Sequence, residues 1–400
     1  MPIDNLLVIL VLVAVVIAAA SWWSARRLKA PLALLEAAPS ERVPEGPPPR
    51  VGLILNPSKN HAERAEAALR AGCAAAGYAP PLVFTTTLED PGRSMALEAL
   101  AAGCTLLVAA GGDGTVREVA EVLAGDPAGP DPWAPQPAGA ASPAAAADGT
   151  RQEGRQEGGQ GTGAGQPPSP RTPAAREAAT LAILPLGTGN LLARNLDIWV
   201  DDIDGAVHTA LYGATRKVDA AAFALERADG RRDGNVFLVM AGIGMDADVM
   251  NDTRLRLKAL AGPIAYAEAG LRHLSGQRRN VDISLDDGPA QRRRVRSVVF
   301  ANCGKLQAGL DFVPDARIDD GLLDIVVMSP GSIGGWMWIA AKTAFRHRGS
   351  IPVIDYYQAR KVRLSVPEPI SAQLDGDPVG KVRSLTVWVL PHALSVRVPG

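Results

Sequence analysis

The sequence has few cysteines, few aromatic residues and almost no net charge, and these shortages exclude several kinds of protein. Three cysteines stand far apart among 400 residues, so neither a zinc site nor a disulfide framework can be read from their spacing. The formal net charge is −1, so no global basic field favours nucleic acid as a partner. The GxxxxGK[ST] motif is absent, and the glycine turns at 111–115 and 187–190 do not follow GxGxxG. A P-loop nucleotide site and hydride chemistry are therefore not supported.

A long uncharged run stands at the start of the sequence. Residues 6–23 carry no charge and would span ~27 Å as a helix, close to the ~30 Å hydrocarbon core of a bilayer. Two tryptophans and three basic residues follow within 22–29, as expected at the cytoplasmic interface. We predict one transmembrane helix at 5–25 and a linker at 26–50, with the rest of the chain on the cytoplasmic side of the cell membrane. A cleaved signal peptide is the alternative, and it is disfavoured because no positive charge precedes the run.

Strand and helix patterns alternate from residue 51. Buried strands are expected at 51–57, 81–87 and 105–110, each followed by a helix. This alternation predicts an α/β domain over 51–215, with a parallel sheet that binds ligands at the carboxyl ends of its strands. Residues 126–179 lack an apolar period and are rich in Ala, Gly, Pro, Gln and Ser. We interpret them as a disordered insert within this domain.

The pattern changes from about residue 216 to short strands bounded by turn residues. We expect an antiparallel β-sandwich domain over 216–400, with two helices near 262–274 and 332–348. The last ~20 residues are a candidate for returning to the first domain. Two domains of this kind are expected to enclose a cleft.

The stretch GGDGT at 111–115 follows a buried strand and precedes a helix. Its glycines remove the β-carbons that would keep a phosphate from the backbone N–H groups at the helix start. Asp113 is unusual there, because a carboxylate repels phosphate unless a metal ion lies between them, so we predict a Mg²⁺-nucleotide. Thr115 and Glu118 have the spacing of a capping box. The alternative is an ordinary strand–helix turn that uses glycine for its geometry.

A second glycine turn, LPLGTGN at 184–190, ends another strand and leads into LLARNL. Two such turns at the carboxyl ends of strands in one sheet are expected to converge on one crevice. Thr87 ends a further strand of the same sheet, although an ordinary turn residue explains it equally well.

Four motifs in this order and spacing resemble the diacylglycerol kinase catalytic family: GGDGT, LPLGTGN, DDGLLDIV at 319–326 and QLDGDP at 373–378. That family includes bacterial diacylglycerol kinase-like lipid kinases, sphingosine kinases and ceramide kinases. The resemblance implies a Rossmann-like α/β domain that binds ATP, as in NAD kinase and phosphofructokinase, and a C-terminal antiparallel β-sandwich. A lipid site would lie between them. It also implies that ATP contacts Thr87, Gly111, Gly112, Asp113, Gly114, Thr115, Val116, Arg117 and Thr188.

The resemblance places the general base in a late DGE loop, which here reads Asp375-Gly376-Asp377. Asp377 therefore replaces a glutamate and is shorter by one methylene, and a misplacement of ~1 Å can cost about 10²-fold in rate. We expect the backbone of the turn to compensate. Asp377 and Asp113 are the predicted catalytic residues, with Asp113 acting through the metal ion. The alternative is a surface Asp-Gly hairpin turn.

The resemblance further implies a structural Mg²⁺ held by the Asp320 carboxylate and the backbone carbonyls of Arg317 and Leu322. Considered without the resemblance, Asp319, Asp320 and Asp324 surround a glycine in a composition suited to a hard cation. A plain loop leading into the next strand is the alternative.

Together these features predict a membrane-anchored kinase that transfers the γ-phosphate of ATP to a lipid hydroxyl, in diacylglycerol or a related lipid alcohol. Its expected partners are ATP, Mg²⁺, the lipid and the membrane, without nucleic acid, and a homodimer is left open. NAD kinase is one alternative, because it shares GGDGT. The N-terminal run, GTGN and the late DGD argue against it. A non-catalytic membrane-anchored lipid or nucleotide sensor is the other alternative.

Overall fold

The computed structural model describes residues 48–125, 176–244, 278–305, 312–313, 315–330 and 353–400. Five predicted features lie wholly or mostly outside this part: the transmembrane helix, the linker, the 126–179 insert and the helices near 262–274 and 332–348. Within the described ranges, no helix is long and apolar enough to cross a membrane.

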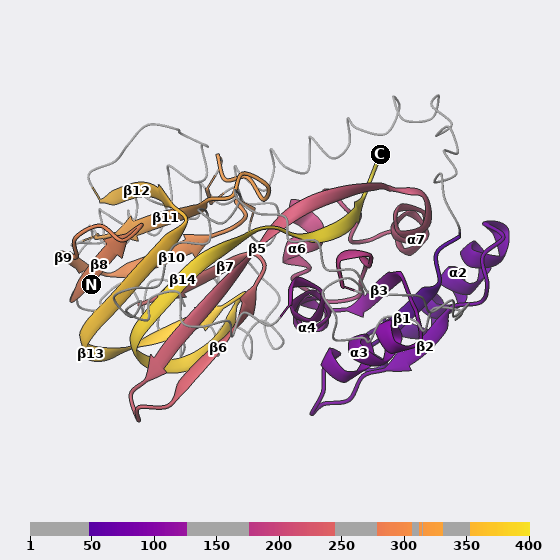
Figure 1. Ribbon diagram of the computed structural model, residues 1–400, viewed down its shortest axis with the longest axis horizontal. Coiled ribbons are helices and arrows are strands. Elements are labelled where there is room, and N and C mark those ends of the chain that lie inside the picture. Colours follow the sequence, from indigo (N-terminus) through magenta and orange to yellow (C-terminus); the bar gives the residue numbers. More distant parts are fainter. Residues whose placement is uncertain (1–47, 126–175, 245–277, 306–311, 314, 331–352) are drawn as a thin grey trace, which may run out of the picture.

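The N-terminal part is a parallel sheet with helices on both faces (Figure 1), as the sequence predicts. Its strands pair in the order β4–β3–β1–β2, all parallel. The helices α2 and α7 cover one face and the helices α3 and α4 the other. The strands are β1 (Val51–Leu55), β2 (Leu82–Thr85), β3 (Leu106–Gly111) and β4 (Thr180–Pro185), and the helices are α2 (Ala62–Ala75), α3 (Arg93–Ala101), α4 (Asp113–Ala124), α6 (Leu191–Asn195) and α7 (Ile203–Tyr212).

Helix α4 begins three residues earlier than its predicted capping box indicates. Its N-cap is Gly112, and no side chain caps it. The Thr115 side chain is buried and turned toward Gly111, where an added β-carbon would lie 2.6 Å from the Thr115 Cβ and Oγ1 atoms. The capping-box prediction is therefore wrong. Thr115 does not cap the helix because its side chain fills the space that the missing β-carbon of Gly111 leaves.

The C-terminal part is the predicted antiparallel β-sandwich, and its strands enclose a second hydrophobic core. It contains β5 (Ala214–Arg227), β6 (Arg232–Phe237), β7 (Met240–Ile243), β8 (Arg279–Leu285), β9 (Gln291–Val295), β10 (Ser297–Ala301), β11 (Leu323–Met328), β12 (Ile354–Ala359), β13 (Lys361–Leu374) and β14 (Asp377–Val398). One path of paired strands runs β12–β11–β10–β7–β13–β14. The strand β13 pairs with β8 along its first half and with β7 near its end, on either side of an irregular register.

The long strand β14 joins the two parts of the molecule (Figure 1). Most of it pairs antiparallel with β13 and β5, and near its end Val396 pairs in parallel with Leu181 of β4. The pairing with β5 shifts between Leu390 and Leu394, and a shift of this kind bends a strand. One sheet therefore continues from the sandwich into the parallel sheet, and the chain end lies against the first part.

Residues 235–244 form two strands where the sequence suggests one. The break falls at Leu238 and Val239, before β7 begins at Met240, and the backbone N–H groups of these three residues donate to the Asp375 carboxylate at 2.9–3.0 Å. Because these donors are directed at a side chain, they are lost to the ladder between neighbouring strands. The break positions the hairpin that carries Asp375.

Candidate active site

The two glycine turns lie directly against each other at the carboxyl ends of β3 and β4. A β-carbon on Gly187 would lie 2.6 Å from the Gly112 Cα atom, closer than any real side chain could approach. The backbone N–H of Leu186 donates to the Gly111 carbonyl at 2.8 Å and aligns the two turns. The convergence that the sequence predicts is therefore present in the structure.

Asp113 joins the two turns. One carboxylate oxygen accepts the backbone N–H of Asn190 at 2.9 Å and the other accepts that of Leu191 at 2.6 Å. Burial raises the pKa of the Asp113 carboxyl, the two N–H groups oppose that shift, and the charge of Asp377 adds to it. The sequence had suggested contact with a metal ion. The structure shows instead that both oxygens already serve as acceptors inside the protein.

The second turn is closed by its own asparagine. The Asn190 Oδ1 atom accepts the backbone N–H of Gly187 at 2.9 Å, and its Nδ2 donates to the Gly187 carbonyl at 2.7 Å. Asn190 adopts a left-handed conformation, with φ of 50°. Thr188 is exposed at the tip of the turn, so its side chain faces solvent beside the junction.

Arg117 connects this junction to the DGD hairpin. Its Nη1 atom lies 3.2 Å from the Asp377 Oδ2 atom, and both side chains are partly buried. The two residues are 260 positions apart and come from α4 and the start of β14. The predicted base therefore lies beside the helix that follows the first glycine turn.

The hairpin is a two-residue turn between β13 and β14, since Leu374 pairs with Asp377. Asp375 and Gly376 both have positive φ, 47° and 85°, as in a type I′ turn. Asp375 is buried, and its carboxylate accepts the three N–H groups that interrupt the strand pattern at 238–240. The turn is therefore fixed to the body of the protein and is not the surface hairpin of the alternative interpretation.

Val116 and Thr87, two further predicted ATP contacts, lie in different surroundings. The Val116 side chain is buried in the first core, and its N–H donates to the Gly112 carbonyl at 3.1 Å. Both groups are therefore used inside the protein, and the contact of Val116 with ATP stays a prediction. Thr87 is exposed after β2, and its Oγ1 atom accepts the Asp90 N–H at 3.1 Å. The neighbouring Thr86 hydroxyl is buried and has no hydrogen-bond partner among the described residues.

Lys59 lies beside the first glycine turn and was missed by the sequence analysis. A β-carbon on Gly112 would lie 3.6 Å from the Lys59 Cε atom and 3.7 Å from its Nζ atom. The turn that carries Lys59 follows β1 and is tied to β3 by the Asn56 N–H, which donates to the Ala110 carbonyl at 2.9 Å. The sequence signal for this residue was a lysine in the segment that follows the first strand.

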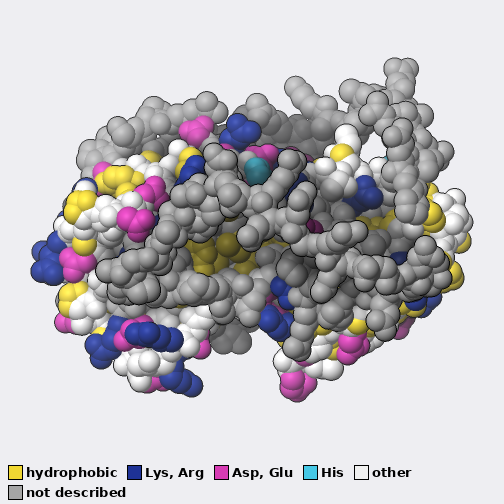
Figure 2. Space-filling view, viewed as in Figure 1, with side chains coloured by type: hydrophobic (Ala, Val, Ile, Leu, Met, Phe, Trp, Pro, Cys, Tyr) yellow, Lys and Arg dark blue, Asp and Glu magenta, His cyan; other side chains and the backbone are white. Residues whose placement is uncertain are grey.

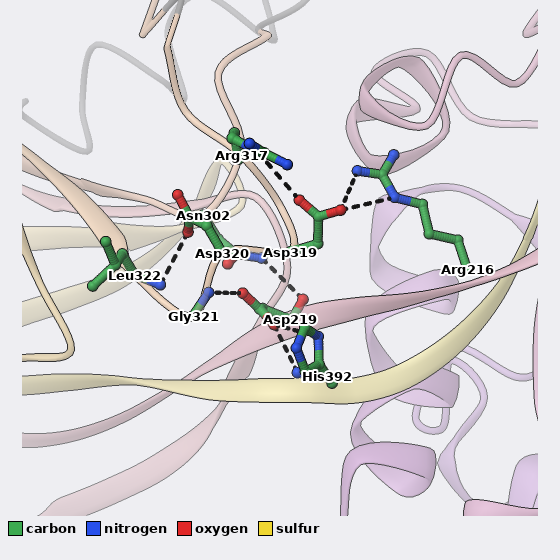
Figure 3. Close-up of polar contacts among 9 residues, drawn as sticks. All are labelled: Arg216, Asp219, Asn302, Arg317, Asp319, Asp320, Gly321, Leu322 and His392. Atoms are coloured by element: carbon green, nitrogen blue, oxygen red, sulfur yellow. Dashed lines mark hydrogen bonds and ion pairs between the residues drawn. The ribbon is translucent and has the colours of Figure 1, made fainter.

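The loop at 317–322 is ordered by a second buried carboxylate that the sequence analysis did not single out (Figure 3). Asp219 of β5 is buried and accepts the backbone N–H groups of Gly321 at 2.7 Å and His392 at 2.6 Å. It thereby ties together β5, this loop and the bend of β14. A lone aspartate inside an apolar strand, in KVDAAAF, was the only signal.

The three aspartates of this loop do not converge. Asp319 pairs with Arg216 at 2.6 Å and with Arg317 at 3.6 Å (Figure 3), while Asp324 accepts from Gln358 at 3.0 Å. In the described ranges, no group of three or more His, Cys, Asp or Glu side chains is arranged to hold a metal ion. The idea of a three-carboxylate site is therefore wrong, because two of its members are directed at other partners.

The smaller donor set from the resemblance is compatible with the loop. Among the described residues, the Asp320 Oδ1 atom accepts the Leu322 N–H at 3.0 Å and no other hydrogen bond. The carbonyls of Arg317 and Leu322 accept no hydrogen bond from a described residue. One carboxylate and two free carbonyls are hard oxygen donors of the kind that Mg²⁺ takes together with water.

Apolar side chains are visible in a hollow between the sandwich and the α/β part, with Lys and Arg side chains at its edge (Figure 2). Apolar and basic side chains so close together suit a substrate with both polar and apolar portions.

Comparison with known families agrees with this geometry. Residues 50–223 match the model of the diacylglycerol kinase catalytic domain. Residues 239–398 match the model of the YegS C-terminal NAD kinase beta sandwich-like domain. The two matches cover the parallel sheet with its glycine turns and the sandwich with its DGD hairpin.

Individual relatives give the same result at low identity. The chain is 24% identical over 318 residues to a diacylglycerol kinase of Bacillus subtilis, covering 79% of this chain and 85% of the relative. It is 29% identical over 329 residues to a "Probable lipid kinase YegS-like" of Pseudomonas aeruginosa, covering 80% and 85%. The fold resembles the crystal structure of a putative diacylglycerol kinase from Bacillus anthracis, with a TM-score of 0.58, 20% identity and coverage of 87% and 96%. The chain belongs to the diacylglycerol kinase catalytic family of ATP-dependent lipid kinases.

Proposed function

We propose that this protein is a membrane-anchored lipid kinase that transfers the γ-phosphate of ATP to the hydroxyl of diacylglycerol or a related lipid alcohol. The observation that carries the proposal is the contact between Arg117 and Asp377. This contact brings the Asp377 carboxylate, which suits proton transfer, close to the helix that follows the first glycine turn, which suits phosphates.

The nucleotide phosphates would lie over Gly112 and Gly114, whose backbone is free of side chains. Apart from its chain neighbours and the backbone of its own helix, no atom of the described residues lies within 4 Å of a β-carbon built on Gly114, so the helix start is open there. The N-terminus of α4 favours negative charge. Lys59 supplies a positive charge beside Gly112. Asp113 would act here by holding the second turn against the first.

The reaction would be an in-line displacement at the γ-phosphorus. The lipid hydroxyl oxygen forms the new P–O bond as the bond to the β-phosphate oxygen breaks, and ADP leaves. Asp377 would accept the hydroxyl proton, and Arg117 would hold its carboxylate toward the crevice. Charge stabilisation and positioning are the main demands of phosphoryl transfer, and positioned general bases contribute ~10²–10⁴-fold.

The membrane anchor and the metal ion are further parts of the proposal. The uncharged run at 6–23 supports a single-pass anchor with the catalytic part on the cytoplasmic side. A tethered kinase can act on a lipid that stays in the bilayer. Mg²⁺ bound with ATP would neutralise phosphate charge. A structural Mg²⁺ at Asp320 and the carbonyls of Arg317 and Leu322 would stiffen the loop that Asp219 holds.

The test uses full-length protein in mixed micelles with Mg²⁺ and γ-labelled ATP. The lipid panel contains diacylglycerol, a sphingoid base, ceramide and other hydroxylated lipids. Label is expected in one lipid class, and Asp377→Asn should reduce its transfer at least ~10²-fold while nucleotide binding is retained. Asp229→Asn, in the exposed turn after β5, is the matched control.

A further variant tests the assignment of the nucleotide site. Lys59→Met should weaken ATP binding about tenfold, the loss expected for one charge at a phosphate site. Nucleotide binding without transfer to any lipid would contradict the kinase proposal and favour the sensor.

A further inference from the structure

A cavity of about 280 Å³ lies outside the crevice described above. Its wall is built from the end of α6, the start of β5, the segment after β10, Val313 and the segment 316–318. Among the lining residues are Arg216, Lys305 and Arg317, and none of those residues is an Asp or Glu. No residue of either glycine turn lines it. The cavity therefore presents three cations and is separate from the proposed nucleotide site.

The cations are held in place by carboxylates behind the wall. Arg216 donates from Nε and Nη2 to Asp319, at 3.2 and 2.6 Å, while Arg317 approaches the same carboxylate from the other side at 3.6 Å (Figure 3). The Lys305 Nζ atom lies 2.6 Å from the Asp197 carboxylate. The carboxylates of Asp319 and Asp197 thus pair with the three cations of the wall.

Most donors of these side chains remain available. The described residues use two of the five N–H groups of Arg216, and Arg317 has the single 3.6 Å contact. The segment with Lys305 is rigid, because the Asn195 side chain both accepts the Lys305 N–H and donates to its carbonyl, each at 2.9 Å. Rigid, pre-positioned donors lower the ordering cost of binding.

We propose that this cavity is a binding site for a phosphate group, carried either by inorganic phosphate or by a phosphomonoester lipid headgroup. Two guanidinium groups and one ammonium match the several acceptor oxygens of a phosphate dianion, which arginine engages through paired N–H donors. Cys303, Val313 and Ile318, all buried, form apolar wall beside the cations. Their low polarity strengthens the attraction for an anion.

The experiment measures phosphate binding with the nucleotide site filled. Full-length protein in neutral detergent micelles is saturated with Mg²⁺ and a non-hydrolysable ATP analogue, and inorganic phosphate is then titrated by calorimetry. In a second arm, micelles containing phosphatidic acid are titrated in place of inorganic phosphate. Micelles with phosphatidylcholine only are the lipid control. The variants are Lys305→Gln and Arg317→Gln. Arg294→Gln, an exposed arginine of β9, removes the same charge elsewhere.

Wild type and Arg294→Gln are expected to bind the phosphate group equally. Each cavity variant should bind it about tenfold more weakly, and added salt should weaken all binding. Binding of inorganic phosphate identifies a free phosphate as sufficient, and binding of phosphatidic acid alone identifies the lipid headgroup.

Absence of both, or equal affinity in cavity variants and control, would overturn the proposal. Because Arg317 is 71% exposed, Arg317→Gln should stay folded even if Lys305→Gln does not. In that case the phosphate affinity of Arg317→Gln is by itself sufficient to test the proposal. The readout is independent of lipid phosphorylation, so failure of the kinase proposal would not produce the same result.

Discussion

The Arg117 guanidinium lies 3.2 Å from the Asp377 carboxylate. It spans the junction between a helix of the parallel sheet and a hairpin of the sandwich. Asp377 is shorter than the glutamate expected from the family resemblance, and the contact offers one means of holding the shorter side chain in position. The other is the turn itself, since Asp375 fixes the hairpin to the backbone at 238–240.

Arg117→Gln should lower kcat about 10- to 100-fold, because an unsupported base is misplaced by ~1 Å. The melting temperature should hardly change, since a partly exposed ion pair contributes at most about 1 kcal/mol. Arg64→Gln removes an equivalent but exposed pair with Asp204 and is the control. Initial rates and thermal denaturation check both variants, and unchanged kcat in Arg117→Gln would remove its positioning role.

Gly187→Ala and Gly114→Ala should separate stability from nucleotide binding. The new methyl at 187 meets the backbone of Gly112 at 2.6 Å, so we expect a loss of about 1–3 kcal/mol of unfolding free energy. The methyl at 114 meets no protein atom within 4 Å, so stability should hold or rise, by ~0.5–1 kcal/mol. ATP affinity should nevertheless fall if phosphates approach that backbone. If Gly114→Ala binds ATP as tightly as wild type does, the phosphates bind elsewhere.

Asp375→Asn should destabilise the protein by about 1.5–3 kcal/mol, because an amide cannot accept all three N–H groups that the buried carboxylate accepts. Urea denaturation measures the loss, with Asp229→Asn as the exposed control. Equal stabilities of the two variants would show that the hairpin is held by other contacts.

Asp319 should make stability depend on acid pH. The hydrogen bond from Arg216 holds the pKa of the Asp319 carboxyl below its ordinary value, so its contribution is complete above ~3.9, the unfolded value. That contribution is lost as the pH falls through the lower folded pKa. The gap in unfolding free energy between wild type and Asp319→Asn should therefore narrow below about pH 3.9. Urea titrations between about pH 2.5 and 5 test this, and a constant gap would contradict it.

Mg²⁺ should stabilise the protein without nucleotide if the loop at 317–322 binds it. Wild type is expected to melt at a higher temperature in millimolar MgCl₂ than in EDTA, and Asp320→Asn should remove that difference. Asp355→Asn, an exposed aspartate of β12, is the control. An unchanged melting temperature for wild type would argue against the metal site.

Local sequence patterns predicted much of the fold. The strands β1 and β3 are continuous apolar runs, and the helices between strands end at glycines. The start of α4 and the break at 238–240 were missed. In each place a contact from elsewhere in the chain or a missing β-carbon overrides the local preference.

The alternation of strands and helices, both glycine turns and the family could be predicted from the sequence, because they depend on neighbouring residues and short motifs. Only the tertiary structure decided that Asp113 joins the turns, that Arg117 meets Asp377 and that Asp219 holds the loop at Gly321. These pairs are separated by 77 to 260 positions. Asp113 reaches the second turn because β3 pairs with β4, and Arg117 meets Asp377 because β14 runs between the sandwich and β4. No local pattern encodes these pairings.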